Sequence, residues 1–155
     1  MGIACSIEIE STDCPERKQK YKMYQIAETD EYDLWLGHLV RPFSYSSPFI
    51  GQEFVLLLVV ADPTITNEDQ VALSKDIVRQ GCRFAVCTGH QCSIWDDSID
   101  FAYLETSPDF SPSDEHFVMT TWHEDEPLED VIAFFRFCTA FDNFTPHHYL
   151  ALILG

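Results

Sequence analysis

The stretch from Phe117 to Phe135, FVMTTWHEDEPLEDVIAFF, constrains the fold more than any other part of the chain. It begins as an apolar, β-rich run, passes through an acidic corner, and continues as an amphipathic pattern that opens at Pro127. Proline is well tolerated in the first turn of a helix, and apolar residues at helical spacing mark the side that faces a core. We therefore predict a strand over 116–122 and a helix over 127–138.

The same succession of strand and helix occurs upstream. The run FVLLLVVA at 54–61 is continuous and apolar, as in a strand buried on both faces of a parallel sheet. A helix is predicted over 66–81, where Thr66 is placed to cap its start, and a shorter helix near 94–103. Further strands are predicted over 82–89 and 148–154.

This alternation of strands and helices predicts one α/β domain. Crossovers between parallel strands are right-handed, and they place helices against the sheet that the strands form. The expected architecture is three-layered, with a mostly parallel central sheet and helices on both faces, as in flavodoxin-like and Rossmann-like folds. Because such folds host many activities, the architecture alone predicts no function.

The first third of the chain, residues 1–51, is expected to add a strand, a loop and a helix to the βα core formed by residues 52–155. Near its start isoleucine alternates with glutamate, as in an edge strand. Residues 11–23 are polar and are predicted to be a loop or a frayed helix. Thr29 then resembles a helix N-cap, and apolar residues follow at helical spacing as far as Arg41.

The charge balance is strongly negative. The chain carries 26 Asp and Glu residues against 9 Lys and Arg residues, a net charge of −17. Binding to nucleic acid depends on cationic groups that displace counterions from phosphates, so no nucleic-acid partner is expected. A basic protein is the favoured partner, because a negative field accelerates its encounter with this chain. Solubility and a high-salt habitat are the alternative explanations of the charge.

The apolar runs and the cysteines predict a reduced, cytoplasmic protein. The longest apolar run, 54–61, is far shorter than the roughly 20 residues that span a membrane, and charges throughout the first 30 residues exclude a secretory signal. The six cysteines are therefore expected to be free thiols, with disulfides in an extracellular setting as the alternative. Gly2 and Ser6 match a myristoylation signal beside Cys5, which leaves a lipid-anchored adaptor as a third class. Membrane attachment is not expected, since one acyl chain anchors weakly and anionic lipid repels this chain.

Polar residues follow the predicted strands at their carboxyl ends, where parallel sheets bind ligands. These residues are Asp62, His90, His123 and Glu124, and they are the candidate acid, base or metal-ligand groups of an enzyme. The ordinary alternative is that loops are polar wherever strands end, and that Asp62 caps a turn before Pro63.

Motifs for common cofactors are missing or incomplete. The turn after the first buried strand contains no glycine, and neither the dinucleotide fingerprint nor the P-loop pattern occurs, so no cofactor is predicted. Cys87, His90 and Cys92 are weak candidates for a zinc site, because free cysteine is more often a small buried apolar side chain. A Cys92 nucleophile is disfavoured, since acidic surroundings raise the pKa of a thiol.

Three runs resemble segments of small uncharacterised bacterial α/β domains of unknown function. They are GCRFAVCTG, SIWDDSIDFAYLE and the 117–135 stretch, and the likeness covers roughly residues 54–155. Its most specific part is TTWHEDEPLEDV, from Thr120 to Val131. The resemblance implies a bacterial or phage domain, and it transfers no catalytic residue.

These observations favour a small, acidic, non-enzymatic domain that recognises a basic partner protein. A role in bacterial defence or immunity would suit such a domain. The loop after residue 42 is rich in aromatic side chains, and Phe43, Tyr45 and Phe49 are the candidate partner contacts, expected at the surface. The alternative is an enzyme or ligand sensor, hydrolase-like or metal-assisted, whose site lies at the carboxyl ends of the parallel strands.

Overall fold

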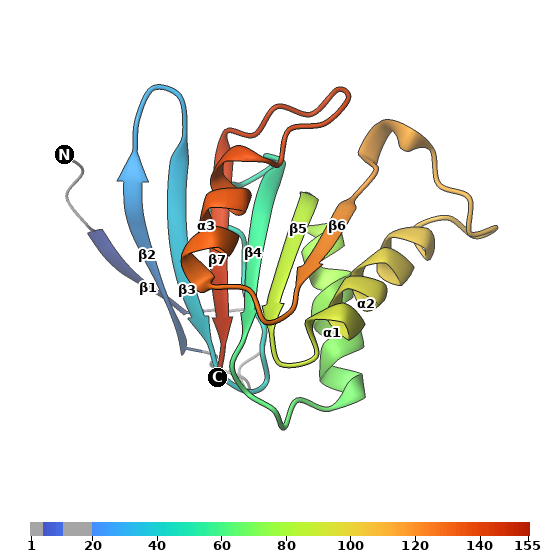
Figure 1. The fold of residues 1–155 in the computed structure, drawn as a ribbon, viewed down its shortest axis with the longest axis horizontal. Helices are drawn as coiled ribbons and strands as arrows, with labels where there is room; N and C mark the ends of the chain where they lie inside the picture. Colours follow the sequence, from blue (N-terminus) through green and yellow to red (C-terminus); the bar gives the residue numbers. More distant parts are fainter. Residues whose placement is uncertain (1–4, 11–19) are drawn as a thin grey trace.

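A computed structural model describes residues 5–10 and 20–155, with side chains described from Tyr21 onward. Over these residues, seven strands form one mixed, mostly parallel sheet, and three α-helices pack on it (Figure 1). In spatial order the strands are β1 (Cys5–Glu10), β2 (Lys20–Glu28), β3 (Asp33–Leu39), β7 (His148–Leu154), β4 (Phe54–Val60), β5 (Cys82–Gly89) and β6 (Met119–His123). β1, β2 and β3 pair antiparallel, whereas β3, β7, β4, β5 and β6 all run parallel. The chain therefore has an α/β fold.

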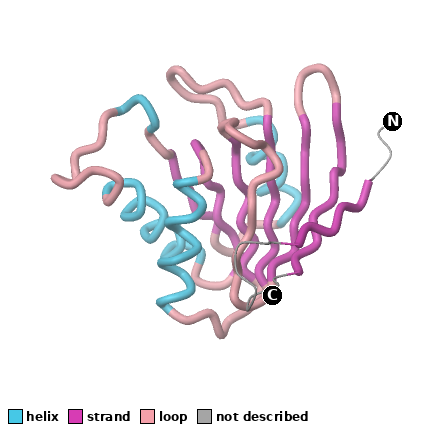
Figure 2. Tube along the Cα trace, turned by 180° about the vertical axis from the view of Figure 1, so that it is seen from behind, coloured by secondary structure: helices cyan, strands magenta, loops and turns pink. Residues whose placement is uncertain are grey.

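Helices cover both faces of the sheet. α1 (Asn67–Arg79) and α2 (Cys92–Leu104) contribute Leu73, Ile77 and Ile99 to one core, on the side that Figure 2 turns toward the viewer. α3 (Leu128–Phe137) contributes Val131 and Phe135 to a second core on the opposite face. Crossovers between parallel strands share one hand, so the return from β6 to β7 places α3 opposite the helices of the outward path. Within the described residues, no helix combines the length and apolarity that crossing a membrane requires.

The order of the parallel strands does not confirm a flavodoxin-like arrangement. Flavodoxin-like sheets follow the order 2-1-3-4-5. Here the last strand, β7, lies between the first two parallel strands of the chain, β3 and β4. β7 is the apolar sequence HYLALIL, and its central position buries the three leucines on one face and Tyr149 on the other, where Ala151 and Ile153 are half-buried.

The N-terminal third is a strand hairpin, so the predicted helix after Thr29 is wrong. β2 includes residues 20–23, which the sequence placed in a loop or frayed helix, and β3 occupies the predicted helix. The Thr29 hydroxyl does accept hydrogen bonds from the backbone N–H groups of Glu31 and Tyr32, each at 3.1 Å, but it closes the turn between two strands. The predicted edge strand is confirmed as β1. Gly2 and residues 11–19 lie outside the described residues, as do the side chains of Cys5 and Ser6.

Local patterns in the rest of the chain are confirmed. Thr66 caps α1 by accepting a hydrogen bond from the Asp69 N–H at 3.2 Å. Gly81 follows the helix at φ +105°, and β5 and β7 have the predicted bounds. α2 is longer than predicted, β6 begins at Met119, and Pro127 precedes α3 as its N-cap.

The aromatic loop between β3 and β4 is part of the core, so it is not the exposed partner surface that the sequence predicted. Phe43, Tyr45 and Phe49 are each at most 4% exposed, and they pack with Met23 and Leu39. Gln80 at the end of α1 holds this loop by donating to the Tyr45 carbonyl at 2.9 Å. The loop thus covers the part of the sheet that α1 and α2 leave open.

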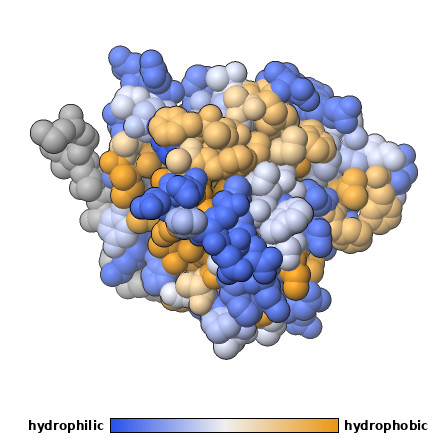
Figure 3. All heavy atoms as spheres, viewed as in Figure 1, coloured by the Kyte–Doolittle hydropathy of each residue, from blue (hydrophilic) through white to orange (hydrophobic). Residues whose placement is uncertain are grey.

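α3 exposes two apolar side chains that the periodicity placed toward the core. Leu128 and Ile132 are 51% and 43% exposed, and Phe137, which lies outside that pattern, is 79% exposed. Figure 3 shows hydrophobic and hydrophilic residues side by side on the face that carries α3. Val131 and Phe135 are the buried residues of the helix, and Phe134 packs against the same core while partly exposed. The other two helices of the described residues pack into the core on the opposite face.

Two carboxyl groups of α2 lie on the side of β6, with Asp96 buried and Asp100 half-buried. The Thr120 hydroxyl donates to Asp100 Oδ1 at 2.7 Å, whereas Asp96 Oδ1 has no hydrogen-bond partner and Asp96 is 4% exposed. Burial raises the pKa of both carboxyls, and neighbouring carboxylates raise it further, against the opposing effect of the Thr120 hydroxyl. An ionised Asp96 therefore destabilises the folded state.

We predict that Asp96→Asn raises the free energy of unfolding by about 1–2 kcal/mol near neutral pH, because it removes a buried, poorly paired charge. A pKa raised on folding contributes stability below the unfolded value, about 3.9 for Asp, and loses it as pH rises through the folded value. The advantage of the variant should thus be absent near about pH 3.5 and grow toward neutrality. Urea unfolding across this range measures it, with Asp30→Asn, an exposed residue of the β2–β3 turn, as control. A gain that does not depend on pH would contradict the prediction.

Candidate functional site

Asp62 lies at the carboxyl end of β4 as predicted, but it organises a turn. Its Oδ1 accepts hydrogen bonds from the backbone N–H and the hydroxyl of Thr64, at 2.7 and 2.6 Å. These bonds lower the pKa of the Asp62 carboxyl, with a smaller contribution from Arg41. The backbone N–H of Asp62 also donates to the Leu154 carbonyl. Its carboxylate is thus held by local partners, as in the turn-capping alternative.

The other predicted residues of this edge have separate surroundings. His90 is exposed, and its backbone N–H donates to the Val60 carbonyl at 2.8 Å. His123 is buried, and its Nδ1 lies 2.8 Å from a carboxylate oxygen of Glu126. Glu124 is exposed in the turn before α3. The hollows described below are lined by none of the four predicted catalytic candidates.

The cysteines near this edge do not assemble a metal site. Cys87 and Cys92 are buried, whereas His90 is exposed. Over the described part of the chain, no group of three or more His, Cys, Asp or Glu side chains could hold a metal ion. Burial raises the pKa of the Cys92 thiol, partly offset by backbone N–H donors. Cys92 is therefore a poor nucleophile in this setting.

Loop lengths explain why the polar hollows lie at the opposite, amino-terminal edge of the parallel strands. At the carboxyl edge, residues 90–91 and 124–127 are the whole of two connections. At the amino edge, residues 105–118 and 138–147 lead back into β6 and β7, and the loop before β4 arrives there too. Long connections build the walls of a hollow, whereas short turns leave a low rim.

Three adjoining hollows cross this amino edge, and we refer to them together as the amino-edge trough. The first, about 230 Å³, is lined by residues 28–33 with His147 and His148. The second, about 420 Å³, shares those two histidines and extends to residues 51–53, Arg83 and His116. The third, about 480 Å³, shares residues 51–53, Arg83 and His116 with the second and ends beside α1 and α2. A further hollow of about 340 Å³ lies between α1 and α2 and is mostly apolar.

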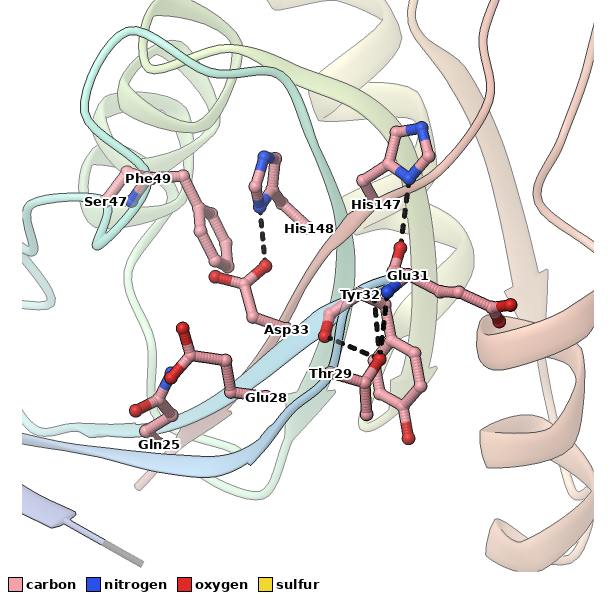
Figure 4. Close-up of polar contacts among 10 residues, drawn as sticks. All are labelled: Gln25, Glu28, Thr29, Glu31, Tyr32, Asp33, Ser47, Phe49, His147 and His148. Atoms are coloured by element: carbon pink, nitrogen blue, oxygen red, sulfur yellow. Dashed lines mark hydrogen bonds and ion pairs between the residues drawn. The ribbon is translucent and has the colours of Figure 1, made fainter. Parts of the chain in front are cut away.

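The β2–β3 turn forms the acidic end of the trough (Figure 4). The Thr29 N–H donates to the Tyr32 carbonyl at 2.8 Å, which closes the turn and leaves Asp30 and Glu31 exposed. His147 Nδ1 lies 3.0 Å from the Glu31 carbonyl oxygen, so the start of β7 holds the turn in place.

A second contact joins β3 to β7 at the same end. His148 Nδ1 lies 2.5 Å from Asp33 Oδ1, and the His148 ring packs on Phe49 at a centroid distance of 4.9 Å. Figure 4 shows His148 pointing at the Asp33 carboxylate while His147 points at the turn. The two neighbouring histidines therefore hold different parts of one wall, as expected for adjacent strand residues.

Arg83 forms the floor of the middle of the trough. It is 4% exposed and ion-pairs with Glu53, while its Nε donates to the Phe117 carbonyl at 2.8 Å. Its guanidinium group lies 5.6 and 5.2 Å from the ring centroids of Phe141 and Phe144. A buried guanidinium is tolerated only when it is paired and hydrogen-bonded, and these partners meet that need.

The far end of the trough is apolar. Val78 and Val118 line it together with Tyr103, whose hydroxyl donates to the Ser113 carbonyl at 2.7 Å. Burial raises the pKa of the Cys82 thiol in this wall to about 12. The thiol is therefore protonated at neutral pH and behaves as an apolar wall rather than as a nucleophile.

Carboxylates dominate the charge of the trough. Its lining includes six carboxylates against two guanidinium groups. Both guanidinium groups are already paired, Arg79 with Asp76 and Arg83 with Glu53. The six carboxylates are Glu28, Asp30, Glu31, Asp33, Glu53 and Glu115. Glu53 is itself paired with Arg83, but the carboxylates still outnumber the guanidinium groups, so their charges sum to a negative potential that attracts cations.

Reasoning from the sequence missed this site because the rule for parallel sheets points to the other edge. One signal was present: the acidic run ETDEYD at 28–33 and the pair HH at 147–148 both precede apolar strand sequences. Treating 29–41 as a helix removed β3 from the parallel sheet. Without β3 in the sheet, the sequence could not indicate that the starts of β3 and β7 are neighbours.

Comparison with known proteins gives a family and no activity. No curated protein and no solved structure matches the chain. Residues 35–155 match the family described as a domain of unknown function, DUF7684. The match begins within β3 and covers the parallel strands β4 to β7 and all three α-helices, so β1 and β2 lie outside it. The matched region is most of the chain, and the protein belongs to this DUF7684 family.

Proposed function

We propose that this protein is a binding domain that recognises a positively charged segment of a partner protein in the amino-edge trough. The observation that carries the proposal is the lining of the trough, with six carboxylates against two guanidinium groups that are already paired. Lysine and arginine side chains of a partner would meet this lining, and the net charge of −17 would accelerate their approach.

The shape of the site supports a segment rather than a small molecule. The three hollows adjoin one another across the starts of successive strands, and each opens to solvent along the amino edge. Small-molecule sites are mostly enclosed, apolar pockets with a few polar groups, whereas the middle of this trough is polar. Imidazole, amide and hydroxyl groups along it, such as His116, Asn143 and Thr145, are suited to bond the backbone of an extended chain.

A matched pair of charge variants tests this function. The double variant Asp30→Asn, Glu31→Gln removes two trough carboxylates, and Glu129→Gln, Asp130→Asn removes two exposed carboxylates of α3. Both change the net charge equally, so nonspecific attraction falls equally. We expect the trough variant to bind a hepta-lysine peptide about tenfold more weakly, which corresponds to about 1.4 kcal/mol, and the α3 variant less than twofold more weakly.

Titration followed by NMR measures the affinity and locates the peptide at the same time. Chemical shifts of residues 29–33 and 147–148 should move most, and the affinity should fall as salt increases. Equal weakening in both variants would mean diffuse attraction to an acidic surface. The absence of binding, or shifts confined to other surfaces, would overturn the proposed function.

A further inference from the structure

The chemistry of the amino-edge trough changes from one end to the other. Glu28, Asp30 and Glu31 line the end beside the start of β3. The other end is centred on the start of β5 at Cys82, where Val78 and Val118 line it and no carboxylate other than Glu53 contributes. A site that only attracts cations needs no apolar end. The change from acidic to apolar lining therefore indicates an occupant with a cationic part and an apolar part.

Strand spacing sets the distance between the two ends. From β3 to β5 the sheet order is β3-β7-β4-β5, which makes three steps between neighbouring strands. At about 4.8 Å a step, the separation is about 14 Å. An extended chain advances about 3.3–3.4 Å per residue, so about four residues cover it. Residues four apart in an extended chain also point to the same side, whereas residues three or five apart do not.

From this geometry we infer that the trough recognises an extended segment with an arginine or lysine and a large apolar residue four positions apart. This inference rests on the proposed function and specifies its partner. The cation meets the carboxylates of residues 28–33, and the apolar side chain enters the end formed by Val78, Tyr103 and Val118. The residue midway between them lies near the starts of β7 and β4, the two strands between β3 and β5.

Peptides in a neutral glycine–serine background test the spacing. Each carries two adjacent arginines and one leucine, with the leucine two to six positions from the nearer arginine and in both orders along the chain. Titration of the intact protein, followed by NMR, gives the affinity and the location of each peptide. We expect spacing four, in one of the two orders, to bind at least fivefold more tightly than spacings three and five.

A substitution at the apolar end separates the leucine contact from the charge contact. Val78 is half-buried, and Val78→Thr keeps its shape while adding a hydroxyl. The variant should weaken the spacing-four peptide at least threefold and leave a peptide with the two arginines and no leucine unchanged. A thermal melt of the variant confirms that it is folded.

The outcomes distinguish the two levels of the hypothesis. If arginine peptides bind in the trough with no dependence on leucine or on its spacing, the inference is wrong and the proposed function stands. If a different spacing is preferred, the extended conformation is wrong. If no cationic peptide binds in the trough, the proposed function fails and this inference fails with it.

Discussion

Gly89→Ala is expected to lower the free energy of unfolding by about 4 kcal/mol, combining backbone strain with a steric clash. Gly89 ends β5 at φ +93°, a conformation that L-residues rarely adopt. A Cβ atom there would lie 2.3 Å from the backbone oxygen and 2.9 Å from the backbone nitrogen of Val60. Val60 ends the central strand β4, so its backbone cannot move away without disturbing the sheet.

Gly51→Ala is the matched control for this prediction. Gly51 also has a positive φ, +70°, but a Cβ atom there would meet nothing within 4 Å. Gly51→Ala should therefore lower the free energy of unfolding by only about 1 kcal/mol, the cost of a positive φ for alanine. Urea unfolding of both variants measures the difference. Equal losses would show that the close approach of Gly89 to β4 is incorrect.

The second large effect is expected at α3, where Phe135→Ala should cost about 3–5 kcal/mol. Phe135 is 1% exposed, and its ring meets Tyr149 edge-to-face at 5.4 Å, in the core that also contains Val55 and Leu57. Removing the ring leaves a cavity between α3 and the sheet. The cost is large because Val131 and Phe135 are the buried residues of this helix.

Phe137→Ala makes the same chemical change two residues further along α3. Phe137 is 79% exposed, so this substitution should change the free energy of unfolding of the protein by less than about 0.5 kcal/mol. Should Phe135→Ala unfold the protein, Phe135→Leu provides a milder test with a loss of about 1–2 kcal/mol. A loss at Phe137 as large as that at Phe135 would mean that α3 turns its other face to the sheet.

The confirmed parts of the fold are those in which local and tertiary preferences agree. The apolar run of β4 can be satisfied only in the interior, and Thr66 and Gly81 mark the two ends of α1 through backbone hydrogen bonds and a positive φ. The β3 segment shows the opposite case. Its residues fit a helical spacing, yet pairing with β2 and β7 makes it a strand. The packing there is close: a Cβ atom added at Gly37 would lie 2.8 Å from the Leu152 side chain.

The acidity behind the candidate site could be predicted from the sequence, but the location of the site could not. The negative charge follows from composition, because counting carboxylates needs no coordinates, and a basic partner stays a prediction drawn from it. The edge of the sheet that carries the hollows depends on which connections are long, and on β3 lying beside β7. Likewise, the aromatic rings of Phe43 and Phe49 are buried because they pack in one core with Met23 and Leu39 of the sheet.

The amino-acid sequence by itself determined the βα succession, the parallel core and the acidic character of this protein. These properties follow from hydrophobic periodicity, capping residues and charge, which act over a few neighbouring residues or over the whole composition. Only the tertiary structure decided the strand order, the burial of the aromatic loop, and the meeting of the 28–33 turn with His147 and His148 at one edge. Contacts between segments more than a hundred residues apart depend on how the sheet is assembled, and no local pattern encodes that assembly.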